Sequence, residues 1–456
     1  MMKRFLSALL CACVLISMTG CAQDQEAPED LLYSSAPIQF NSDSSSEEES
    51  SSEPEESQAE NSSSAAQNSS SQAPSSSSSA ASSQQSSSAA PSSLSQASSS
   101  QASSSQASSS QASSQSSSSS QQTSSKPSAN NSVTAPSGEM RAVWFSYLDL
   151  SSMIKQKSRS EFESAISKAF SDVANDGYNT VFVQVRPFGD ALYDSDLFPW
   201  SYILTGTEGV SPGYDPLQIM IDQAHAKGLS VEAWVNPYRI RNSSNGGQAL
   251  SSDNPASDWL DSGSDVVIEY GGGIYYNPGS EEAREHIVAG VEEIVRNYDV
   301  DGIHFDDYFY PTTDSAFDAD TYSDYKASGG KLSLGDWRRD NVDQLVREVY
   351  STIKSIDSSV RFGISPQGNT SINYSEQYID VEEWLSNPGY VDYICPQLYY
   401  GFENDTCPFA ATVAEWNSLI RRNDIDLYIG ISVSKIGLVD QWAGSGKNEW
   451  VENDDM

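Results

Sequence analysis

Residues 160–186, SEFESAISKAFSDVANDGYNTVFVQVR, place a helical pattern directly before a strand-like one. The first part predicts a helix over 160–175, because Ser160 can cap it and its apolar residues share one face. The second part, 180–186, is rich in β-branched residues and predicts a buried strand. The apolar helix positions are Phe162, Ile166, Ala169, Phe170 and Val173. The stretch is therefore one helix–strand unit of an α/β protein.

The same alternation of helices and strands fills the chain after residue 138. Strands are predicted over 141–147, 180–186, 229–237, 301–306, 361–366, 391–398 and 426–433. Helices are predicted over 160–175, 216–227, 281–298, 337–356 and 409–422. Seven such units in about 300 residues favour a (β/α)8 TIM barrel over a doubly wound sheet. The first strand is followed by no glycine-rich phosphate motif, which also disfavours a dinucleotide-binding fold.

The number of predicted strands is one short of the eight that close a TIM barrel. The sequence stops at Met456, where a last helix and strand would begin. An open barrel exposes two sheet edges, so we expect a truncated form of a longer protein or a barrel that lacks its last βα unit. The alternative is an overlooked strand within 265–276, where a small hairpin in a long loop is the favoured interpretation.

Residues 1–21 have the order of a secretion signal, with two basic residues before an apolar run over 5–16. That run is too short to span a bilayer as a permanent helix. Its end, SMTGC over 17–21, resembles the lipobox of bacterial lipoproteins. The resemblance implies lipid attachment at Cys21 and a location on the extracytoplasmic face of a bacterial cell membrane. A plain signal peptide cut nearby is the alternative.

Residues 22–138 consist mostly of Ser, Gln, Ala, Asn, Pro and Glu, with few residues that could form a core. Burial in such a segment cannot offset the entropy lost on ordering, so we expect a disordered tether between the anchor and a folded domain over 139–456. A low-complexity insert without a selected length is the alternative.

Charge and cysteine content exclude several classes of protein. The chain holds 63 acidic and 25 basic residues, a net charge of −38, which repels polyanions and excludes a nucleic-acid binder as the leading idea. Only Cys395 and Cys407 lie after the predicted signal and anchor, too few for a disulfide scaffold or a four-cysteine metal site. Two free thiols are expected, with a single bridge as the alternative. We expect a monomer without metal or cofactor.

In a TIM barrel the active site lies at the C-terminal ends of the strands. The residues expected there combine carboxylates, amides and aromatic rings, which respectively cleave glycosidic bonds, bind hydroxyls and stack on sugars. Substrate contacts are predicted at Arg186, Asp190, Trp234, Asn236, His304, Tyr308, Gln397, Tyr399 and Tyr400, with Ser365 and Gln367 nearby. This set predicts a cleft for a glycan.

The segment over 301–311, DGIHFDDYFYP, carries the predicted catalytic residues. Strand alternation places His304, Asp306 and Tyr308 on one face and Asp307 on the other, unless the strand ends at Asp306 and a turn returns Asp307 to the mouth. Two adjacent acids at a strand exit favour catalysis over a purely structural role of holding the loop. Asp306 and Asp307 are therefore the predicted catalytic pair.

Seven motifs after residue 138 resemble the glycosyl hydrolase-like 10 family. They are EMRAVW over 139–144, GYNTVFVQVR over 177–186, GDALY over 189–193, EAWVNPY over 232–238, YNP over 276–278, the 301–311 segment and CPQLY over 395–399. The resemblance implies a TIM-barrel glycosidase of bacterial envelopes, often a lipoprotein, with wall glycan as substrate. It supplies no established catalytic residues.

The 301–311 segment is also similar to the fourth-strand regions of two other glycosidase groups. Chitinase-type family 18 enzymes have Glu where Tyr308 stands and Asp where His304 stands, so their acid is missing here. Amylase-type family 13 enzymes have their nucleophile at the position of Asp306, but their second acid has no counterpart. The second carboxylate must then come from Asp307, Asp190, Glu208 or Glu232. For Glu232 we favour a structural pairing with an inward Arg such as Arg186.

The leading functional hypothesis is a surface-tethered glycosidase that cleaves O-glycosidic bonds of a polysaccharide, with peptidoglycan glycan as the expected substrate. Whether it retains or inverts configuration depends on the separation of the two carboxylates. The alternative is a non-catalytic lipoprotein that binds glycan in the same cleft. A solute-capture lipoprotein for transport fits less well, because such proteins have two α/β lobes.

Overall fold

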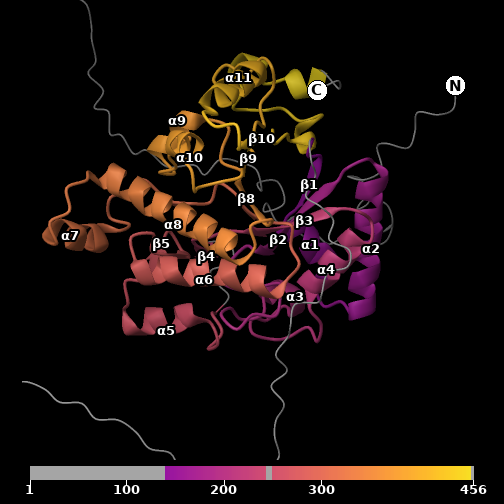
Figure 1. Cartoon of the computed structure of the whole chain (residues 1–456), viewed down its shortest axis with the longest axis horizontal. Coiled ribbons are helices and arrows are strands. Elements are labelled where there is room, and N and C mark those ends of the chain that lie inside the picture. The colour runs from indigo at the N-terminus through magenta and orange to yellow at the C-terminus, as the bar shows by residue number, and fades with distance from the viewer. Residues whose placement is uncertain (1–138, 243–248, 453–456) are drawn as a thin grey trace, which may run out of the picture. The chain divides into compact units, whose positions relative to one another are not determined.

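The computed structural model describes residues 139–242 and 249–452, so the predicted signal, Cys21 and the tether lie outside the described residues (Figure 1). The centre of the described part is a seven-stranded parallel sheet in the order β1-β2-β3-β7-β8-β9-β10. Its strands are β1 (Ala142–Phe145), β2 (Thr180–Arg186), β3 (Ser230–Val235), β7 (Gly302–Phe305), β8 (Arg361–Ile364), β9 (Tyr393–Ile394) and β10 (Asp426–Leu427).

The sheet is curled, because inward side chains of strands that are not neighbours touch each other. Trp144 of β1 reaches His304 of β7, and the Trp144 ring lies against the backbone of Gly430, just after β10. Parallel strands that follow the chain order and curl in this way confirm the predicted α/β class and TIM-barrel architecture. Within the described residues the sheet has seven strands, as predicted from the sequence.

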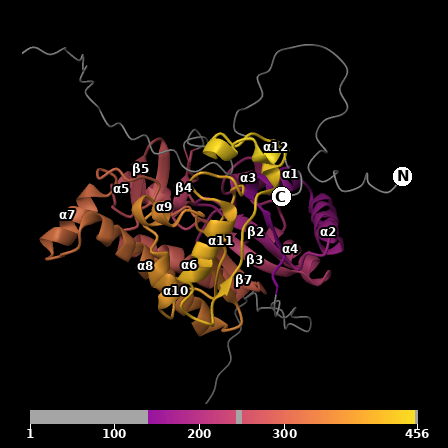
Figure 2. The ribbon, with the colours of Figure 1, turned by 90° about the horizontal axis from the view of Figure 1, so that it is seen from above.

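Helices cover the outer face of this sheet and follow one another around it (Figures 1 and 2). The main ones are α2 (Arg159–Asn175), α4 (Pro216–His225), α6 (Glu281–Asn297), α8 (Leu334–Ile356), α10 (Val381–Ser386) and α11 (Phe409–Leu419). Helix α2 packs beside α4, and α6 beside α8. Four of the five predicted apolar positions of α2 are buried and Ala169 packs at their edge, which confirms the predicted face.

Helix α2 begins one residue earlier than predicted, and its cap is Ser158 rather than Ser160. The backbone N–H of Ser158 donates to the Glu161 carboxylate at 2.9 Å, and the Ser158 hydroxyl accepts from the Glu161 N–H. This reciprocal capping box satisfies two backbone donors, which a cap at Ser160 would leave open. Helix α10 was not predicted from the sequence, and neither were α1 (Tyr147–Ile154), α3 (Tyr202–Thr205), α5 (Pro255–Ser262), α7 (Ala319–Ala327), α9 (Thr370–Ser375) and α12 (Glu449–Glu452).

A second sheet lies in the loop between β3 and β7. Its strands β4 (Arg239–Arg241), β5 (Val267–Tyr270) and β6 (Gly273–Tyr276) pair antiparallel in the order β4-β6-β5. The β5–β6 turn consists of Gly271 and Gly272, both with positive φ, which is the conformation that tight hairpin turns need. The predicted hairpin within 265–276 is therefore confirmed, and it adds no strand to the barrel.

Cys395 and Cys407 are both buried and free, as expected from the sequence, and no disulfide joins them. Over 139–242 and 249–452, no helix is long and apolar enough to cross a membrane.

Candidate active site

Asp306 follows β7 directly and lies buried at the mouth of the barrel. Its carboxylate accepts hydrogen bonds from the Trp234 indole at 3.0 Å, from Asn236 Nδ2 at 2.6 and 2.8 Å, and from the Tyr308 backbone N–H at 3.0 Å. Gln184 of β2 donates to Asn236 Oδ1 at 2.6 Å and so turns the Asn236 amide nitrogen toward Asp306. Each of these partners donates an N–H, so the surroundings suit the ionised form of Asp306.

Asp307 turns back toward the mouth because β7 ends at Phe305, which is the exception allowed by the sequence prediction. Gln397 Nε2 donates to Asp307 Oδ1 at 3.1 Å and to the backbone carbonyl of Ser365 at 2.8 Å. Asp307 is less deeply buried than Asp306. The two predicted catalytic carboxylates therefore both reach the mouth. Residues at the end of β3 hold Asp306, and Gln397, which follows β9, holds Asp307.

Burial is the main reason that the pKa values of both carboxyls are raised. The neighbouring Asp307 charge raises the pKa of Asp306 further, and the Arg239 guanidinium opposes that rise. The Gln397 amide opposes the rise in the pKa of Asp307. Two adjacent carboxyls in a low-dielectric site do not both ionise easily, so the pair retains a proton to a higher pH than free Asp does.

Glu232 points into the barrel but lies near its floor, where it pairs in register with Gly302, the first residue of β7. The Tyr393 hydroxyl donates to Glu232 Oε2 at 2.5 Å, and burial raises the pKa of Glu232 to about 8. The charge beside it belongs to Arg361 of β8. The predicted pairing of Glu232 with Arg186 is therefore wrong, and its place on the floor disfavours Glu232 as the second catalytic acid.

Arg186 points away from the mouth, although simple alternation would turn it inward. The register between β2 and β3 shifts after Gln184, so Arg186 lies beside Val235, whose side chain packs outside the barrel. Its guanidinium lies over the Phe198 ring at 4.4 Å and against Gly290 of α6. An irregular register reverses which face a residue occupies. This corrects the prediction that Arg186 binds substrate.

Asp190 is fully buried in the loop after β2 and acts as a loop cap. It accepts from the Tyr202 backbone N–H at 3.2 Å and lies 3.9 Å from Arg241 Nη1. Arg241 also pairs with Glu208, which is buried as well. Both carboxylates are thus occupied by Arg241. This corrects the prediction that Asp190 contacts substrate and disfavours both acids as the catalytic partner of Asp306.

His304 lies inside the barrel below Asp306 and has no exposed surface. The Trp144 indole can only donate, so its approach to His304 Nε2 at 3.3 Å makes that nitrogen an acceptor, and Ser365 Oγ lies 3.0 Å from the same nitrogen. The ring proton is then on Nδ1, which donates to the Tyr393 oxygen at 2.8 Å, and Tyr393 donates onward to Glu232. His304 is a core residue held by this chain, which corrects its prediction as a substrate contact.

We expect the His304 imidazole to stay neutral with its proton on Nδ1 from about pH 8 to about pH 4.5, because burial lowers its pKa to about 3. Nitrogen-15 NMR of the ring measures both properties. His225 is the internal control, since its hydrogen bond to Asp301 at 2.9 Å raises its pKa and it should titrate above about pH 6.5. Protonation of His304 near pH 6.5 would contradict the burial of this ring and its place in the chain of hydrogen bonds from Trp144 to Glu232.

The aromatic residues predicted at the mouth divide into two groups. Arg239 stacks between the rings of Phe188 at 4.8 Å and Tyr308 at 4.3 Å, which holds Tyr308 beside the carboxylates. The Tyr399 phenol lies near Asp307, and burial raises its pKa. Trp234 is partly exposed while its indole holds Asp306. These rings remain available to a sugar.

Tyr400 points away from the carboxylates. Its ring lies against Gly368 and its hydroxyl faces the Cys407 thiol. The side chain therefore packs the rim of the barrel, which corrects its prediction as a sugar contact.

Three site residues were not predicted from the sequence. Arg239 lies two residues beyond the predicted end of the third strand, and Gln184 is an inward residue of β2 whose alternation with Phe182 could have revealed it. Gln377 approaches Asp307 from the segment after α9, a helix that was itself not predicted. Long-range folding brings it there, so no local pattern could have found it.

The arrangement suits the cleavage of a glycosidic bond. One carboxylate is fixed among N–H donors, a second carries a raised pKa beside it, and partly exposed rings lie at the same mouth. In the part of the chain that the structure describes, no group of three His, Cys, Asp or Glu side chains is placed to hold a metal ion.

Comparison with known proteins agrees with this chemistry. The model of the glycosyl hydrolase-like 10 family matches residues 139–444. Glycosyl hydrolase YngK of Bacillus subtilis (strain 168) is 38% identical over 320 residues, which are 65% of this chain and 61% of YngK. Glycosyl hydrolase DigH of Escherichia coli (strain K12) is 38% identical over 288 residues, which are 57% of this chain and 63% of DigH. The chain thus spans about three fifths of the length of these relatives.

Among solved structures, the glycoside hydrolase domain of PgaB (BpsB) from Bordetella bronchiseptica matches with a TM-score of 0.45 and 13% identity, over 64% of this chain and 84% of that domain. This likeness is too distant to bear on function.

Proposed function

Since this chain belongs to the glycosyl hydrolase-like 10 family, we propose that it is a glycosidase that cleaves O-glycosidic bonds of a polysaccharide. The observation that carries the proposal is the pair Asp306 and Asp307 at the barrel mouth, both with raised pKa values. Glycoside hydrolysis needs two carboxyl groups, one protonated and one ionised, on either side of the scissile bond.

The hydrogen bonds around the pair divide the two roles. Asp306 accepts only from N–H donors, so a proton on its oxygens would face another proton, and we assign it the ionised role of nucleophile or base. Asp307 accepts from Gln397 on Oδ1, which leaves Oδ2 to carry the proton. Asp307 then donates that proton to the leaving oxygen as general acid.

The proposed substrate is the glycan of bacterial peptidoglycan, reached from the cell membrane. A lipobox-like end at Cys21 and a long Ser-rich segment before residue 139 support a lipid-anchored, tethered domain on the extracytoplasmic side. The domain would act as a monomer on a neighbouring wall. Replacing Cys21 with Ser should release the protein from the membrane fraction, and retention there would contradict the anchor.

The activity is tested on purified full-length protein with peptidoglycan glycan strands, alongside neutral polysaccharides, by release of reducing ends. We expect a bell-shaped pH profile displaced upward, because activity needs one proton on the coupled pair and burial raises the pKa values of both carboxyls. The acid limb should therefore lie above the ordinary Asp value of about 4. Binding of glycan strands without release of reducing ends would instead support a non-catalytic glycan-binding protein.

A further inference from the structure

Arg239 is a cation at the barrel mouth whose terminal nitrogens are unpaired. It begins β4 and is only 7% exposed. Its Nε donates to the backbone carbonyl of Pro187 at 3.0 Å, which fixes one side of the guanidinium. Within residues 139–242 and 249–452, neither Nη1 nor Nη2 of Arg239 makes a hydrogen bond or an ion pair. The side chain is not fully buried, so this terminal edge remains open to a ligand.

Two other cations of this region already have partners. Arg241, two residues further along β4, is held by two buried carboxylates of the connection between β2 and β3. Lys435 donates to Asp440 at 2.9 Å and to the backbone carbonyl of Tyr399 at 2.7 Å. Buried charges in proteins are normally paired, because an isolated one is costly. In a chain with 63 acidic residues, an unpaired and nearly buried Arg239 indicates a counter-charge that a ligand supplies.

Direct contacts place Arg239 beside the carboxylate pair. Its guanidinium lies 4.3 Å from the centre of the Tyr308 ring, and the Tyr308 backbone N–H donates to Asp306 Oδ1 at 3.0 Å. The Phe188 ring lies 4.8 Å from the same guanidinium. In the described part of the chain, no ion pair joins Arg239 to Asp306 or Asp307. A group bound at Arg239 therefore lies in the same mouth as the carboxylates without displacing them.

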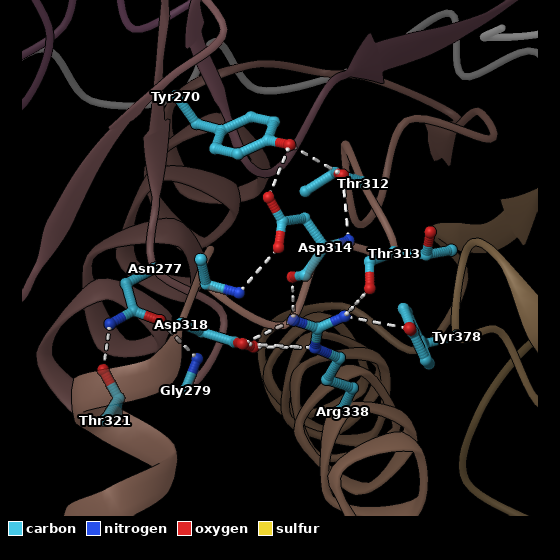
Figure 3. A network of polar contacts seen from close by, with 11 residues as sticks. Tyr270, Asn277, Gly279, Thr312, Thr313, Asp314, Asp318, Thr321, Arg338 and Tyr378 are labelled. Carbon is cyan, nitrogen blue, oxygen red and sulfur yellow. Dashed lines mark hydrogen bonds and ion pairs between the residues drawn. The ribbon is translucent and has the colours of Figure 1, made fainter. Parts of the chain in front are cut away.

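A network of polar contacts joins the segment that carries Arg239 to the one that carries Tyr308 (Figure 3). Tyr270 of β5 belongs to the second sheet, which also contains Arg239 in β4. Its hydroxyl donates to the Asp314 carboxylate at 3.2 Å and accepts from the Thr312 hydroxyl at 3.2 Å, both in the loop after β7. The second sheet and the loop that begins at Asp306 are thus fixed to each other.

Arg338 of α8 holds the same loop from its other side (Figure 3). Its guanidinium forms an ion pair with Asp318 at 2.6 Å and donates to the backbone carbonyl of Asp314 at 2.7 Å. It also donates to the Tyr378 hydroxyl at 2.9 Å, which joins the loop after β7 to the connection between α9 and α10. Because these loops are fixed before a ligand arrives, binding at Arg239 costs little ordering entropy.

The open edge of Arg239 suits a single carboxylate. The two terminal nitrogens of a planar guanidinium match the two oxygens of a carboxylate group. A neutral hydroxyl would leave the charge of Arg239 uncompensated, and a phosphate dianion would bring a second negative charge close to Asp306. The ligand group expected at Arg239 is therefore a monoanionic carboxylate.

We propose that Arg239 binds a carboxylate of the glycan, so that the substrate is an acidic polysaccharide. The inference rests on the proposed function, because the carboxylate belongs to a sugar in the mouth that holds Asp306 and Asp307. Two kinds of sugar supply such a group, namely one with an ether-linked lactate, as in peptidoglycan, and a uronic acid. The contact forms when the substrate binds and persists in the transition state, so it should contribute to KM and not to kcat.

The test measures binding and turnover of four glycans by the full chain. They are peptide-free peptidoglycan strands, the same strands with their carboxylates converted to methylamides, hyaluronan as a uronic acid polymer, and neutral N-acetylglucosamine oligomers. We expect Arg239→Gln to weaken binding of the peptide-free strands, or of hyaluronan, by about 10- to 100-fold. Binding of the methylamide strands and the neutral oligomers should change less than about twofold. Whichever acidic glycan depends on Arg239 identifies the source of the carboxylate.

Arg339→Gln is the matched control, since Arg339 also lies against a tyrosine ring, Tyr374 at 3.8 Å, but pairs with Asp336 on the outer helix α8. It should bind all four glycans as the wild type does. If Arg239→Gln does not fold, Arg239→Lys decides by the same criteria, because it keeps the charge and loses the paired nitrogens.

Equal weakening on acidic and neutral glycans overturns the inference, because Arg239 then serves only to hold Tyr308. Unchanged binding of both acidic glycans also overturns it, as does wild-type cleavage of methylamide strands with the same KM as free strands, although that cleavage would support the proposed function. Arg239-dependent binding without release of reducing ends supports the inference and contradicts only the proposed cleavage.

Discussion

Asp306→Asn is expected to lower glycan turnover by at least about a thousandfold while the protein remains folded. The neutral amide cannot act as nucleophile or base. Its volume matches that of the carboxylate, so the cage formed by Trp234 and Asn236 should persist, although the new amide nitrogen faces two N–H donors. Reducing-end release measures turnover, and circular dichroism with thermal unfolding measures the fold. Turnover within tenfold of the wild type would remove Asp306 from the mechanism.

Asp343→Asn is the matched control for this substitution. Asp343 of α8 accepts a hydrogen bond from the Trp384 indole at 2.6 Å, as Asp306 does from Trp234, and burial likewise raises its pKa to about 7. It belongs to an outer helix rather than to the barrel mouth. The same chemical change there should leave turnover unaltered. The comparison therefore shows whether turnover depends on the carboxylate of Asp306 in particular, rather than on any buried carboxylate that bonds an indole.

The second large effect concerns stability. Arg338→Leu is expected to lower the free energy of unfolding by about 3–5 kcal/mol, because it leaves the buried Asp318 carboxylate without its cation. Leu is a good helix former, so the loss does not come from α8 itself. Urea unfolding followed by tryptophan fluorescence measures the change. A loss below about 1 kcal/mol would show that water replaces the guanidinium and that the cluster in Figure 3 does not hold the loops together.

Two further variants sharpen the stability result. Arg159→Leu removes an arginine from an exposed pair with Glu163 on α2 and should change unfolding little, because solvent screens that pair. The double variant Arg338→Leu with Asp318→Leu removes both buried charges and should recover part of the lost stability, since no unpaired charge then remains. If the double variant lost as much stability as the single variants Arg338→Leu and Asp318→Leu lose together, that result would argue against a direct interaction between these side chains.

The fold could be predicted because its signals are local. Apolar periodicity marked α2, and short β-rich runs marked all seven barrel strands. The last strands, β9 and β10, are shorter than expected, and pairing resumes beyond them only as single bridges such as Gln397 with Gly430. Pro396 has no N–H to donate, which interrupts the regular strand.

The position of Asp306 and Asp307 at the barrel mouth could also be predicted, whereas much of their surroundings could not. Asp306 and Asp307 were placed at the mouth by alternation and by the end of a strand. Arg186 was misplaced because a shift of register leaves no mark in the sequence. His304 was placed on the correct face but at the wrong depth, since alternation gives a direction and not a distance from the rim.

The chain of hydrogen bonds inside the barrel restricts which substitutions its residues can accept during evolution. Trp144, His304, Tyr393 and Glu232 come from β1, β7, β9 and β3, and each proton fixes the orientation of the next one. A substitution at one link therefore leaves a buried polar group of its neighbour without its hydrogen-bond partner. We therefore expect these four residues to be substituted together rather than singly, although they lie far apart in the sequence, because the direction of each hydrogen bond depends on the others.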